Sequence, residues 1–477
     1  MLTNERTHIA IMPSPGAGHL TPLAELAKRL VRHPHDFSVT LIVVSIASSS
    51  PSSQHAYLNH LNSSTSIDVH QLPPADLSDL PDDVPPEPRF FLAVQRSLPN
   101  LRHSLATRSI LPFSALIVDF FAIDAFAVTK ELGIPGYLYF TSSCNNLCHM
   151  FYLPILHATT VCEYRDLEEP IRLPGCVPIM GKDFVEPLQD RKSTAYQIMI
   201  DLAKRYMEAE GVLVNTFEAM EPGPIKALEV PEPGRPPVYT IGPMVQTVGP
   251  VEDLSGSDCL RWLDQQPSES VLFVCFGSGG TLSREQLTEL AFGLELSGQR
   301  FLWVVRSPAE KMSAALFAGG GGGGKEEDEP LDSLPEGFLE RTRGWGLVVP
   351  SWAPQSQVLA HTSTGGFMSH CGWNSTLESV VNGVPLIAWP LYAEQKMNAV
   401  MLTEGAGIAI RAITGEDGLV GREEVVRVVK GLMEEGKEVK QRVKWLQVEG
   451  KKALGEGGSS YKALLDVTEM WRTPKKL

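Results

Sequence analysis

Several features that define other protein classes are missing from this sequence. Its seven cysteines are odd in number and scattered, with no C-x-x-C pair and no Cys/His cluster of zinc spacing. Neither a disulfide framework nor a zinc site is therefore expected. No stretch approaches about 18 uninterrupted apolar residues, and the first apolar run, residues 8–12, is too short for a signal-peptide core. We expect a cytoplasmic protein in a reducing compartment, without membrane insertion.

An excess of basic residues is also missing. The 41 Lys and Arg residues are outnumbered by 56 Asp and Glu residues, which leaves a formal net charge of -15. No long basic run offsets this charge, so a nucleic acid is not an expected partner. The acidic surface is compatible with a soluble monomer. With 43% hydrophobic and 20% charged residues, the composition is that of an ordinary globular protein.

Short β-branched runs alternate with helical patterns along the chain. In the first part, strand-like runs at 8–12, 39–44 and 115–120 are joined by segments such as the amphipathic stretch 22–33. This alternation predicts βαβ units and a parallel, doubly wound sheet. The pattern begins again after residue 270, where the strand-like runs are almost wholly apolar, at 270–280, 300–306, 346–352, 365–372 and 385–390. Continuous apolar strands are typical of sheets that helices cover on both faces.

A Pro/Gly-rich passage at 231–243 and an acidic, turn-rich stretch after it separate the two patterns. We therefore predict an N-terminal domain of residues 1–245, a linker at 246–256 and a C-terminal domain of residues 257–457. Residues 458–477 contain one more helical pattern. The pattern alone leaves open which domain this last helix packs against.

One low-complexity insert interrupts the second pattern. Six glycines at 319–324 precede an acidic run, and we expect a mobile surface loop there, because glycine loses much entropy on ordering and the acids repel one another. With Lys325 the segment is similar to the start of a phosphate-binding P-loop. The match fails because Glu326 stands where a magnesium-binding Ser or Thr is needed, and no strand leads into it.

Two polar residues of the N-terminal domain stand where strands are expected to end. His19 follows the first strand, before a helix that Thr21 could cap and Pro22 could open. Asp119 ends the strand at 115–120. Ligands of open α/β sheets bind at this edge, and a His–Asp pair would make mechanistic sense, because the carboxylate fixes the imidazole tautomer and stabilises its cation. Alternatively, His19 is a polar loop residue and Asp119 caps a helix or loop.

The segment 352–395 concentrates Trp, His, Asn, Ser, Glu and Gln at strand-to-helix junctions. We predict a helix beginning at Asn374 and Ser375, whose free backbone amides and dipole favour a phosphate. The glycine-rich turn at 276–280 is also suited to letting backbone approach a pyrophosphate. Alternatively, Ser375 and Glu378 form a capping box that needs no ligand, and the tryptophans of the segment belong to the core.

Segment 352–395 resembles the 44-residue signature of plant UDP-dependent glycosyltransferases of small molecules, from its opening Trp to its closing Gln, and the likeness covers essentially the whole chain. The resemblance implies an α/β architecture of the GT-B type, in which two Rossmann-like domains with doubly wound parallel sheets face each other across a cleft. The first domain would bind the acceptor and the second the UDP-sugar. The C-terminal helix would return to the first domain. Stretches such as PSPGAGHL and LPGCVPIMGKDF are most similar to hydroquinone- or arbutin-forming phenol glucosyltransferases.

The resemblance also implies residue roles. His19 would be the catalytic base, and Asp119 the acid that orients it. In the C-terminal domain, Trp352 would stack on uracil. The other parts of the UDP-sugar would be bound by Ala353 and Gln355 (base or ribose edge), Glu378 (ribose hydroxyls), Ser278, His370, Asn374 and Ser375 (diphosphate), and Trp373, Ala393, Glu394 and Gln395 (sugar). Thr141 and Ser142 match a stretch whose hydroxyl approaches the donor sugar in relatives, with local packing as the alternative.

The reaction implied is an inverting transfer of glucose from UDP-glucose to the hydroxyl or amine of a small aromatic acceptor, such as hydroquinone, another phenol or indoxyl. His19 would deprotonate the acceptor as its oxygen attacks the anomeric carbon and UDP leaves. We expect no cofactor besides this co-substrate and no metal, because the chain contains no Asp-x-Asp triplet. Two alternatives are a Rossmann dehydrogenase, for which the run at 39–45 lacks the required acid, and a non-catalytic small-molecule carrier.

Overall fold

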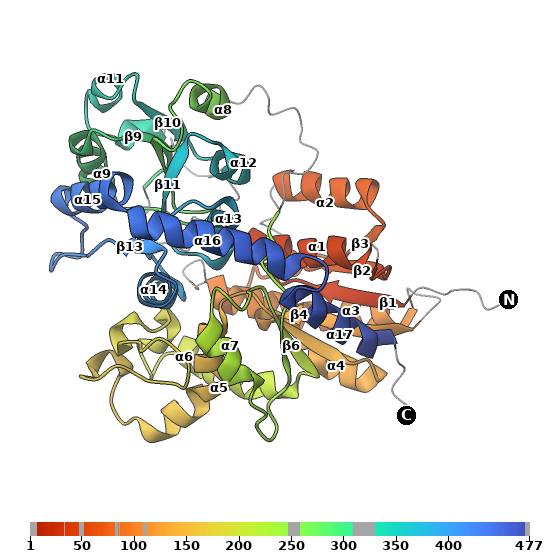
Figure 1. Ribbon diagram of the computed structural model, residues 1–477. Coiled ribbons are helices and arrows are strands. Elements are labelled where there is room, and N and C mark those ends of the chain that lie inside the picture. The colour runs from red at the N-terminus through yellow and green to blue at the C-terminus, as the bar shows by residue number, and fades with distance from the viewer. Residues whose placement is uncertain are drawn as a thin grey trace. The chain divides into compact units, whose positions relative to one another are not determined.

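Strands and helices alternate along the chain, as the sequence pattern predicts (Figure 1). The computed structural model describes residues 7–32, 34–46, 52–81, 84, 86–107, 112–246, 258–308 and 330–472. The chain divides into a first unit, Met1–Met244 with Lys452–Leu477, and a second unit, Val245–Lys451. The glycine run 319–324 and residues 247–256 of the expected linker lie outside the described residues.

The first unit contains a seven-stranded sheet in which every pair of neighbours is parallel. Its order is β3-β2-β1-β4-β5-β6-β7, so the direction of winding reverses between β1 and β4. This is the point at which open α/β sheets bind ligands. The strands are β1 (His8–Met12), β2 (Ser38–Val43), β3 (Ile67–Gln71), β4 (Phe113–Asp119), β5 (Gly136–Phe140), β6 (Gly211–Val214) and β7 (Val238–Thr240).

The helices of the first unit follow from apolar residues at helical spacing. They are α1 (Ala17–Leu30), α2 (Ser52–Ser64), α3 (Pro86–Thr107), α4 (Ala125–Leu132), α5 (Cys144–Thr159), α6 (Thr194–Arg205), α7 (Pro222–Glu229) and α17 (Ser459–Arg472). In α1, Leu20, Leu23 and Ala27 recur every three or four residues and are buried in the core. The α5 helix begins at a capping serine, Ser143, whose hydroxyl accepts from the Asn146 amide at 3.1 Å.

The second unit contains a six-stranded parallel sheet of order β10-β9-β8-β11-β12-β13, with its reversal between β8 and β11. The strands are β8 (Val271–Cys275), β9 (Arg300–Val305), β10 (Gly346–Pro350), β11 (Thr364–Ser369), β12 (Leu386–Ala388) and β13 (Ala409–Arg411). The helices are α8 (Asp258–Leu263), α9 (Arg284–Ser297), α11 (Phe338–Arg341), α12 (Gln355–Ala360), α13 (Trp373–Asn382), α14 (Gln395–Val400), α15 (Arg422–Lys430) and α16 (Lys437–Leu454), whose last three residues fall in the first unit. Every residue of β11 is buried, in keeping with a sheet covered on both faces.

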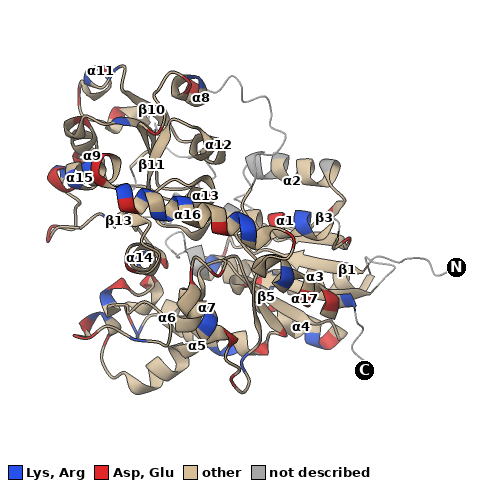
Figure 2. Cartoon of the chain, in the orientation of Figure 1, with Lys and Arg blue, Asp and Glu red and all other residues tan. Residues whose placement is uncertain are grey.

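Charged residues of both signs are distributed over the helices of the described chain. In α15 and α16, for example, acidic and basic residues are interspersed (Figure 2). None of the helices that the structure describes is long and apolar enough to cross a membrane.

The last helix, α17, completes the core of the first unit. Leu464, Val467 and Trp471 are among its buried residues. The Trp471 ring meets the rings of Phe37 and Tyr137 edge-on, at centroid distances of 5.9 and 5.4 Å. Because these partners come from the N-terminal part of the chain, the first unit is assembled from both chain ends.

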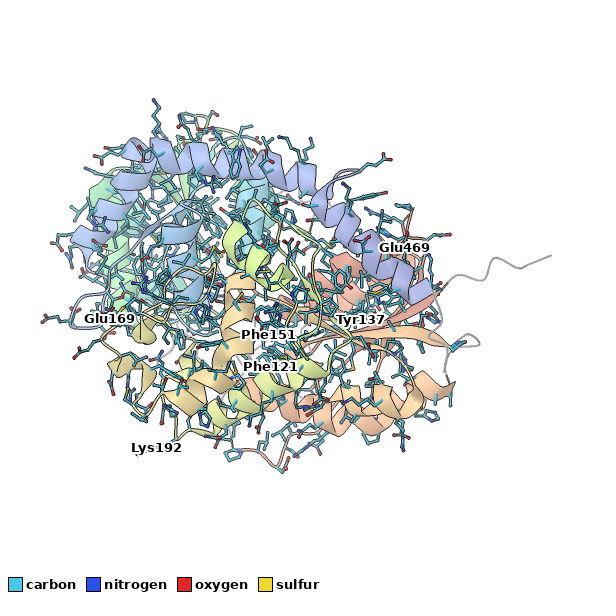
Figure 3. All side chains as sticks on the ribbon, turned by 60° about the horizontal axis from the view of Figure 1, so that its bottom comes forward. Phe121, Tyr137, Phe151, Glu169, Lys192 and Glu469 are labelled. Carbon is cyan, nitrogen blue, oxygen red and sulfur yellow. The ribbon has the colours of Figure 1, made fainter. Side chains whose placement is uncertain are left out.

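Replacement of Trp471 by alanine should destabilise the first unit. Removal of a buried indole costs about 3–5 kcal/mol of unfolding free energy, because the cavity refills only in part. Urea unfolding followed by circular dichroism measures the loss. Figure 3 labels Tyr137, one of the two aromatic partners. The exposed Lys462 of the same helix provides the control Lys462→Gln, which should change stability by less than about 0.5 kcal/mol. Equal stability of the two variants would show that α17 is dispensable for this core.

Candidate functional site

The structure brings His19 and Asp119 together at the carboxyl edge of the first sheet. His19 lies in the first turn of α1, and Asp119 is the last residue of β4. Nδ1 of His19 is 3.2 Å from Oδ2 of Asp119, which is fully buried. The N–H direction is poorly aligned with the carboxylate, so the two groups are in close contact without a well-formed hydrogen bond. With the carboxylate beside Nδ1, Nε2 is the nitrogen that can take a proton from a substrate.

Asp119 is held by donors that the sequence analysis did not identify. The backbone amide and the hydroxyl of Ser14 both donate to Oδ2, at 2.7 and 2.6 Å, and the Phe121 amide donates to Oδ1 at 3.0 Å. These bonds stabilise a buried negative charge and fix its orientation toward His19. Ser14 itself is buried. Its place two residues after β1, at the edge expected to bind ligands, was the signal that could have revealed it.

The first helix begins earlier than the sequence analysis predicted. Gly16 precedes it with φ 111° and ψ 144°, a conformation that residues with a side chain rarely adopt, and its carbonyl accepts from the His19 and Leu20 amides. Thr21 and Pro22 therefore lie inside α1, and the predicted cap at Thr21 is wrong. A glycine that can adopt this conformation starts the helix one turn ahead of the proline.

Aromatic side chains surround the His19 ring. Phe90 of α3 meets it edge-on at 6.1 Å between centroids, and Phe120 and Phe121, which directly follow Asp119, lie at 5.5 and 5.3 Å. A planar apolar molecule can pack well against such a wall of rings. The first sheet therefore combines a candidate base with surroundings suited to an aromatic compound.

Thr141 and Ser142 lie in the loop between β5 and α5. Ser142 is buried, and its hydroxyl accepts from the Asn146 side chain at 2.9 Å, a contact of the kind expected for local packing. Thr141 is partly exposed. The loop is anchored by the fully buried Glu221, which accepts from the backbone amides of Cys144 and Asn145 at 3.0 and 2.8 Å. Burial raises the pKa of Glu221.

In the second unit, Glu378 does not form the capping box that was the alternative interpretation. The α13 helix begins at Trp373, so Ser375 lies within its first turn. Glu378 instead accepts from the side chains of Gln355 at 2.6 Å and Ser356 at 3.3 Å, both in α12. Gln355 also donates to the Ser375 hydroxyl at 3.0 Å. The structure thus brings together three of the predicted nucleotide-binding residues, and burial raises the pKa of Glu378.

His370 lies between two glycine backbones. A Cβ atom at Gly277 would be 2.6 Å from its Cε1, and one at Gly372 would be 2.5 Å from its Nε2, so the ring fills space that side chains would need. Burial lowers its pKa to about 4, and its Nδ1 has no hydrogen-bond partner among the described residues. A neutral, buried, unsatisfied nitrogen just before the N-terminus of α13 points to a polar ligand there.

Three of the predicted sugar-binding residues, Ala393, Glu394 and Gln395, follow β12, whereas Trp373 begins α13. Gln395 is buried, and its side-chain oxygen accepts from the Leu391 and Tyr392 amides at 2.9 and 3.0 Å, which leaves its NH₂ group as the part that can donate to a ligand. The fully buried Asn398, which the sequence analysis missed, donates to the Cys371 carbonyl at 3.0 Å and to Glu394 at 3.3 Å. It ties the segment after β12 to the segment that carries His370.

The three tryptophans of segment 352–395 fall into two groups. Trp373 and Trp389 are buried, at 2% and 4% exposure, as expected for core residues. Trp352 is 64% exposed, so its ring is free to stack on a planar ligand. Ala353 beside it is buried, and Ala393 has a positive φ of 53°, which sets the course of the backbone there.

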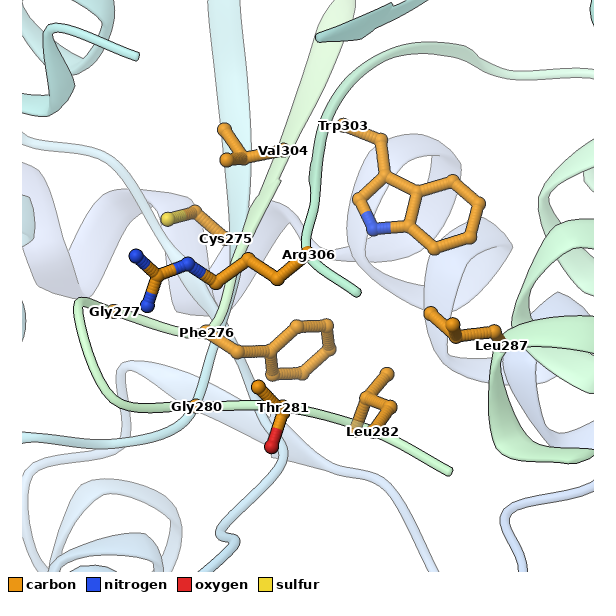
Figure 4. A pocket seen from close by; sticks show the side chains of 10 residues that line it. All are labelled: Cys275, Phe276, Gly277, Gly280, Thr281, Leu282, Leu287, Trp303, Val304 and Arg306. Carbon is orange, nitrogen blue, oxygen red and sulfur yellow. The ribbon is translucent and has the colours of Figure 1, made fainter. Parts of the chain in front are cut away.

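A small pocket lies at the carboxyl ends of β8 and β9 (Figure 4). Its enclosed cavity is only about 10 Å³, the room of about one water molecule, so it does not by itself hold a nucleotide. Among the residues that the structure describes, no three His, Cys, Asp or Glu side chains are grouped so that they could hold a metal ion.

Comparison with known proteins identifies the class. Residues 226–430 match the sequence profile described as UDP-glucoronosyl and UDP-glucosyl transferase. The hydroquinone glucosyltransferase of Rauvolfia serpentina is 50% identical over 97% of this chain and 97% of its own. A UDP-glucosyltransferase from Polygonum tinctorium capable of glucosylating indoxyl, solved with 3,4-dichloroaniline, has a TM-score of 0.89 and 48% identity over 99% of this chain and 100% of its own. Phytolacca americana UGT2, solved with UDP-2fluoro-glucose and pterostilbene, has a TM-score of 0.87 and 49% identity over 98% of this chain and 100% of its own.

The chain therefore belongs to the family of UDP-glucoronosyl and UDP-glucosyl transferases. The predicted resemblance to plant UDP-dependent glycosyltransferases, close to the phenol glucosyltransferases, is confirmed. The predicted fold class is confirmed by the two parallel sheets and by the solved relatives. The predicted enzyme class, a UDP-glucose-dependent glucosyltransferase, is confirmed as well, which removes the dehydrogenase and carrier alternatives.

Buried neutral histidines should make the protein sensitive to acid. Burial lowers the pKa of both His370 and His149, a fully buried residue of α5, to about 4. Between pH 6.5 and about 4 the unfolded chain binds protons that the folded chain does not, so the unfolding free energy falls as the pH falls. Each histidine contributes a slope of at most about 1.4 kcal/mol per pH unit.

Urea unfolding at several pH values across this window tests the expectation. His370→Gln should reduce the slope, because one of the protons taken up on unfolding is lost. The matched control is His103→Gln, at an exposed position of α3, and it should keep the wild-type slope. A slope unchanged in His370→Gln would contradict the assignment of acid sensitivity to this ring.

Proposed function

We propose that the protein transfers glucose from UDP-glucose to the hydroxyl of a small aromatic acceptor, with inversion, to give a β-glucoside. The observation that carries the proposal is the His19–Asp119 pair, set among Phe90, Phe120 and Phe121. It joins a base to a surface suited to an aromatic ring. The relatives support it, since they are a hydroquinone glucosyltransferase, an enzyme capable of glucosylating indoxyl and one solved with pterostilbene.

In the proposed mechanism, Nε2 of His19 removes the acceptor proton while the oxygen attacks the anomeric carbon and UDP leaves. Asp119 stabilises the imidazolium, and Ser14 keeps the carboxylate turned toward it. An amine acceptor would use the same base. The complex of the Polygonum tinctorium relative with 3,4-dichloroaniline supports including amines in the range.

The second unit is proposed to bind the donor. Trp352 would stack on uracil, with Ala353 and Gln355 along the edge of the base or ribose, and Glu378 would accept from the ribose hydroxyls. The diphosphate would be bound by donors and helix amides, from Ser278, His370, Asn374 and Ser375. The glucose hydroxyls would be bound by Trp373, the backbone at Ala393, Glu394 and Gln395. Thr141 and Ser142 are proposed to approach the donor sugar.

The reaction needs no general acid, because UDP is already a good leaving group. We further propose that the enzyme needs no metal and no cofactor besides UDP-glucose, and that it works as a cytoplasmic monomer. The scattered cysteines and the net charge of -15 support a reducing compartment and a monomeric state.

A donor and acceptor panel tests the proposed reaction. The purified protein is incubated with UDP-glucose, UDP-galactose or UDP-xylose and with hydroquinone, indoxyl, pterostilbene or 3,4-dichloroaniline, and products are identified by mass spectrometry and NMR. We expect β-linked glucosides, formed equally well with a chelator present. Loss of turnover on chelation, restored by magnesium or manganese, would contradict metal independence. A panel with no transfer to any aromatic acceptor would refute the proposed substrate class.

Replacement of His19 by alanine should lower turnover by ~100- to 10,000-fold, because general-base catalysis contributes about that much. UDP binding, measured by calorimetry, should stay at the wild-type level. His103→Ala, at an exposed position of α3, is the control and should keep full activity. Wild-type kinetics of His19→Ala with a phenol at neutral pH would show that another group accepts the proton.

A further inference from the structure

Arg306, the residue that directly follows β9, makes contacts that none of the roles described above uses. Its Nε donates to the Ser351 carbonyl at 3.4 Å, and its guanidinium also donates to the Ser278 carbonyl. Figure 4 shows its side chain extending from the end of β9 toward the loop at Gly277. One side chain thus joins two loops whose contact residues, Ser278 and Ser351, are 73 residues apart in the sequence.

The first of these loops sets the direction of Trp352. Ser351 has a positive φ of 63°, which a residue with a Cβ adopts only when its surroundings hold it there. The Ser351 amide donates to the Val305 carbonyl at 2.7 Å, and its own carbonyl accepts from Arg306. The turn is therefore bound on both sides to the end of β9. The next residue is Trp352, whose indole is 64% exposed.

The second loop carries the proposed diphosphate contact Ser278. Gly277 has φ 76° and packs directly against His370, where a Cβ atom would be 2.6 Å from the imidazole. The guanidinium of Arg306 fixes the carbonyl of the next residue, and with it the path of this loop. Burial raises the pKa of Cys275, at the end of β8 just before this loop, to about 11, and the charge of Arg306 opposes that rise.

We propose that Arg306 is a positioning residue that ties the turn carrying Trp352 to the loop carrying Ser278, so that the uracil and diphosphate ends of UDP are bound at a fixed separation. The inference rests on the proposed binding of the donor by the second unit. A planar guanidinium can supply donors to two carbonyls at once, whereas a lysine ammonium is a point charge on a flexible stem. Two loops that are ordered together lose less freedom when they close on one ligand.

The test compares ligands that use one or both loops. Uridine engages the Trp352 side alone, and UDP engages both sides. Calorimetry measures the dissociation constants of uridine and UDP for the wild type, Arg306→Ala and Arg306→Lys. We expect UDP to bind roughly 10- to 100-fold more weakly to both variants, the range for loss of hydrogen bonds from a charged group. Uridine binding should change by less than about threefold, far below what such a loss produces.

The conservative variant separates positioning from charge alone. If Arg306 acted only as a cation near the diphosphate, Arg306→Lys would bind UDP as the wild type does, and the proposal would be overturned. Unchanged UDP binding by Arg306→Ala would overturn it as well. Millimolar guanidinium should partly restore UDP binding to Arg306→Ala. Should that variant fail to fold, Arg306→Lys alone still decides between the two outcomes.

Arg341 provides a matched control in the same unit. Its guanidinium also bridges two partners, the Glu295 carboxylate at 2.6 Å and the Glu336 carbonyl at 2.9 Å, neither of which belongs to the two loops. Arg341→Lys and Arg341→Ala should leave UDP binding unchanged. Because UDP binding is measured without an acceptor, the experiment distinguishes failure of the proposed donor site from failure of the proposal for Arg306. A wild-type protein that does not bind UDP would refute the proposed donor site, whereas normal binding in the Arg306 variants would refute only their positioning role.

Discussion

The structure of the first site depends on the burial of one charge. The Asp119 carboxylate is fully removed from solvent, so its charge has to be balanced by donors supplied by the fold. Ser14 gives two of them, the Phe121 amide gives a third, and His19 stands against the same oxygen that Ser14 binds. These partners come from the ends of β1 and β4 and from the start of α1. The requirement for a satisfied carboxylate thus fixes the geometry of three elements around the proposed base.

In the second unit the buried polar group is a histidine, and it is surrounded by backbone. His370 is buried and neutral, and two glycines come close enough to its ring that any side chain at either position would overlap it. The loop at Gly277 and the start of α13 are the places where we propose that the phosphates of the donor bind. Gln355 of the neighbouring helix α12 donates to both Glu378 and Ser375, so that the proposed ribose and diphosphate contacts share one network. Arg306 adds a further connection, between the loop at Ser278 and the turn at Ser351 that precedes Trp352.

Much of this arrangement could be predicted from the sequence, and the limits have physical causes. The parallel sheets followed from apolar runs alternating with helical patterns, and the edge positions of His19 and Asp119 followed from strand ends. The start of α1 was predicted one turn late, because the conformational freedom of Gly16 outweighed the preference of Pro22 for a first helical turn. Glu378 has the spacing of a capping box, yet it bonds to α12, a tertiary contact that no local pattern encodes. Asn398 and Arg306 were missed for the same reason, whereas Ser14 could have been found from its place just after β1.

The placement of α17 determines when the core of the first unit can be completed during synthesis of the chain. The first sheet is complete once residue 240 has been synthesised, but its core still lacks Leu464, Val467 and Trp471, which are translated only after the whole second unit. Until then Phe37 and Tyr137 lack the indole that packs against both of them. The nascent chain therefore carries an unfinished apolar surface while the whole second unit is synthesised, the kind of transient exposure for which chaperones exist. A helix that is translated after the second unit thus completes the core of the first unit.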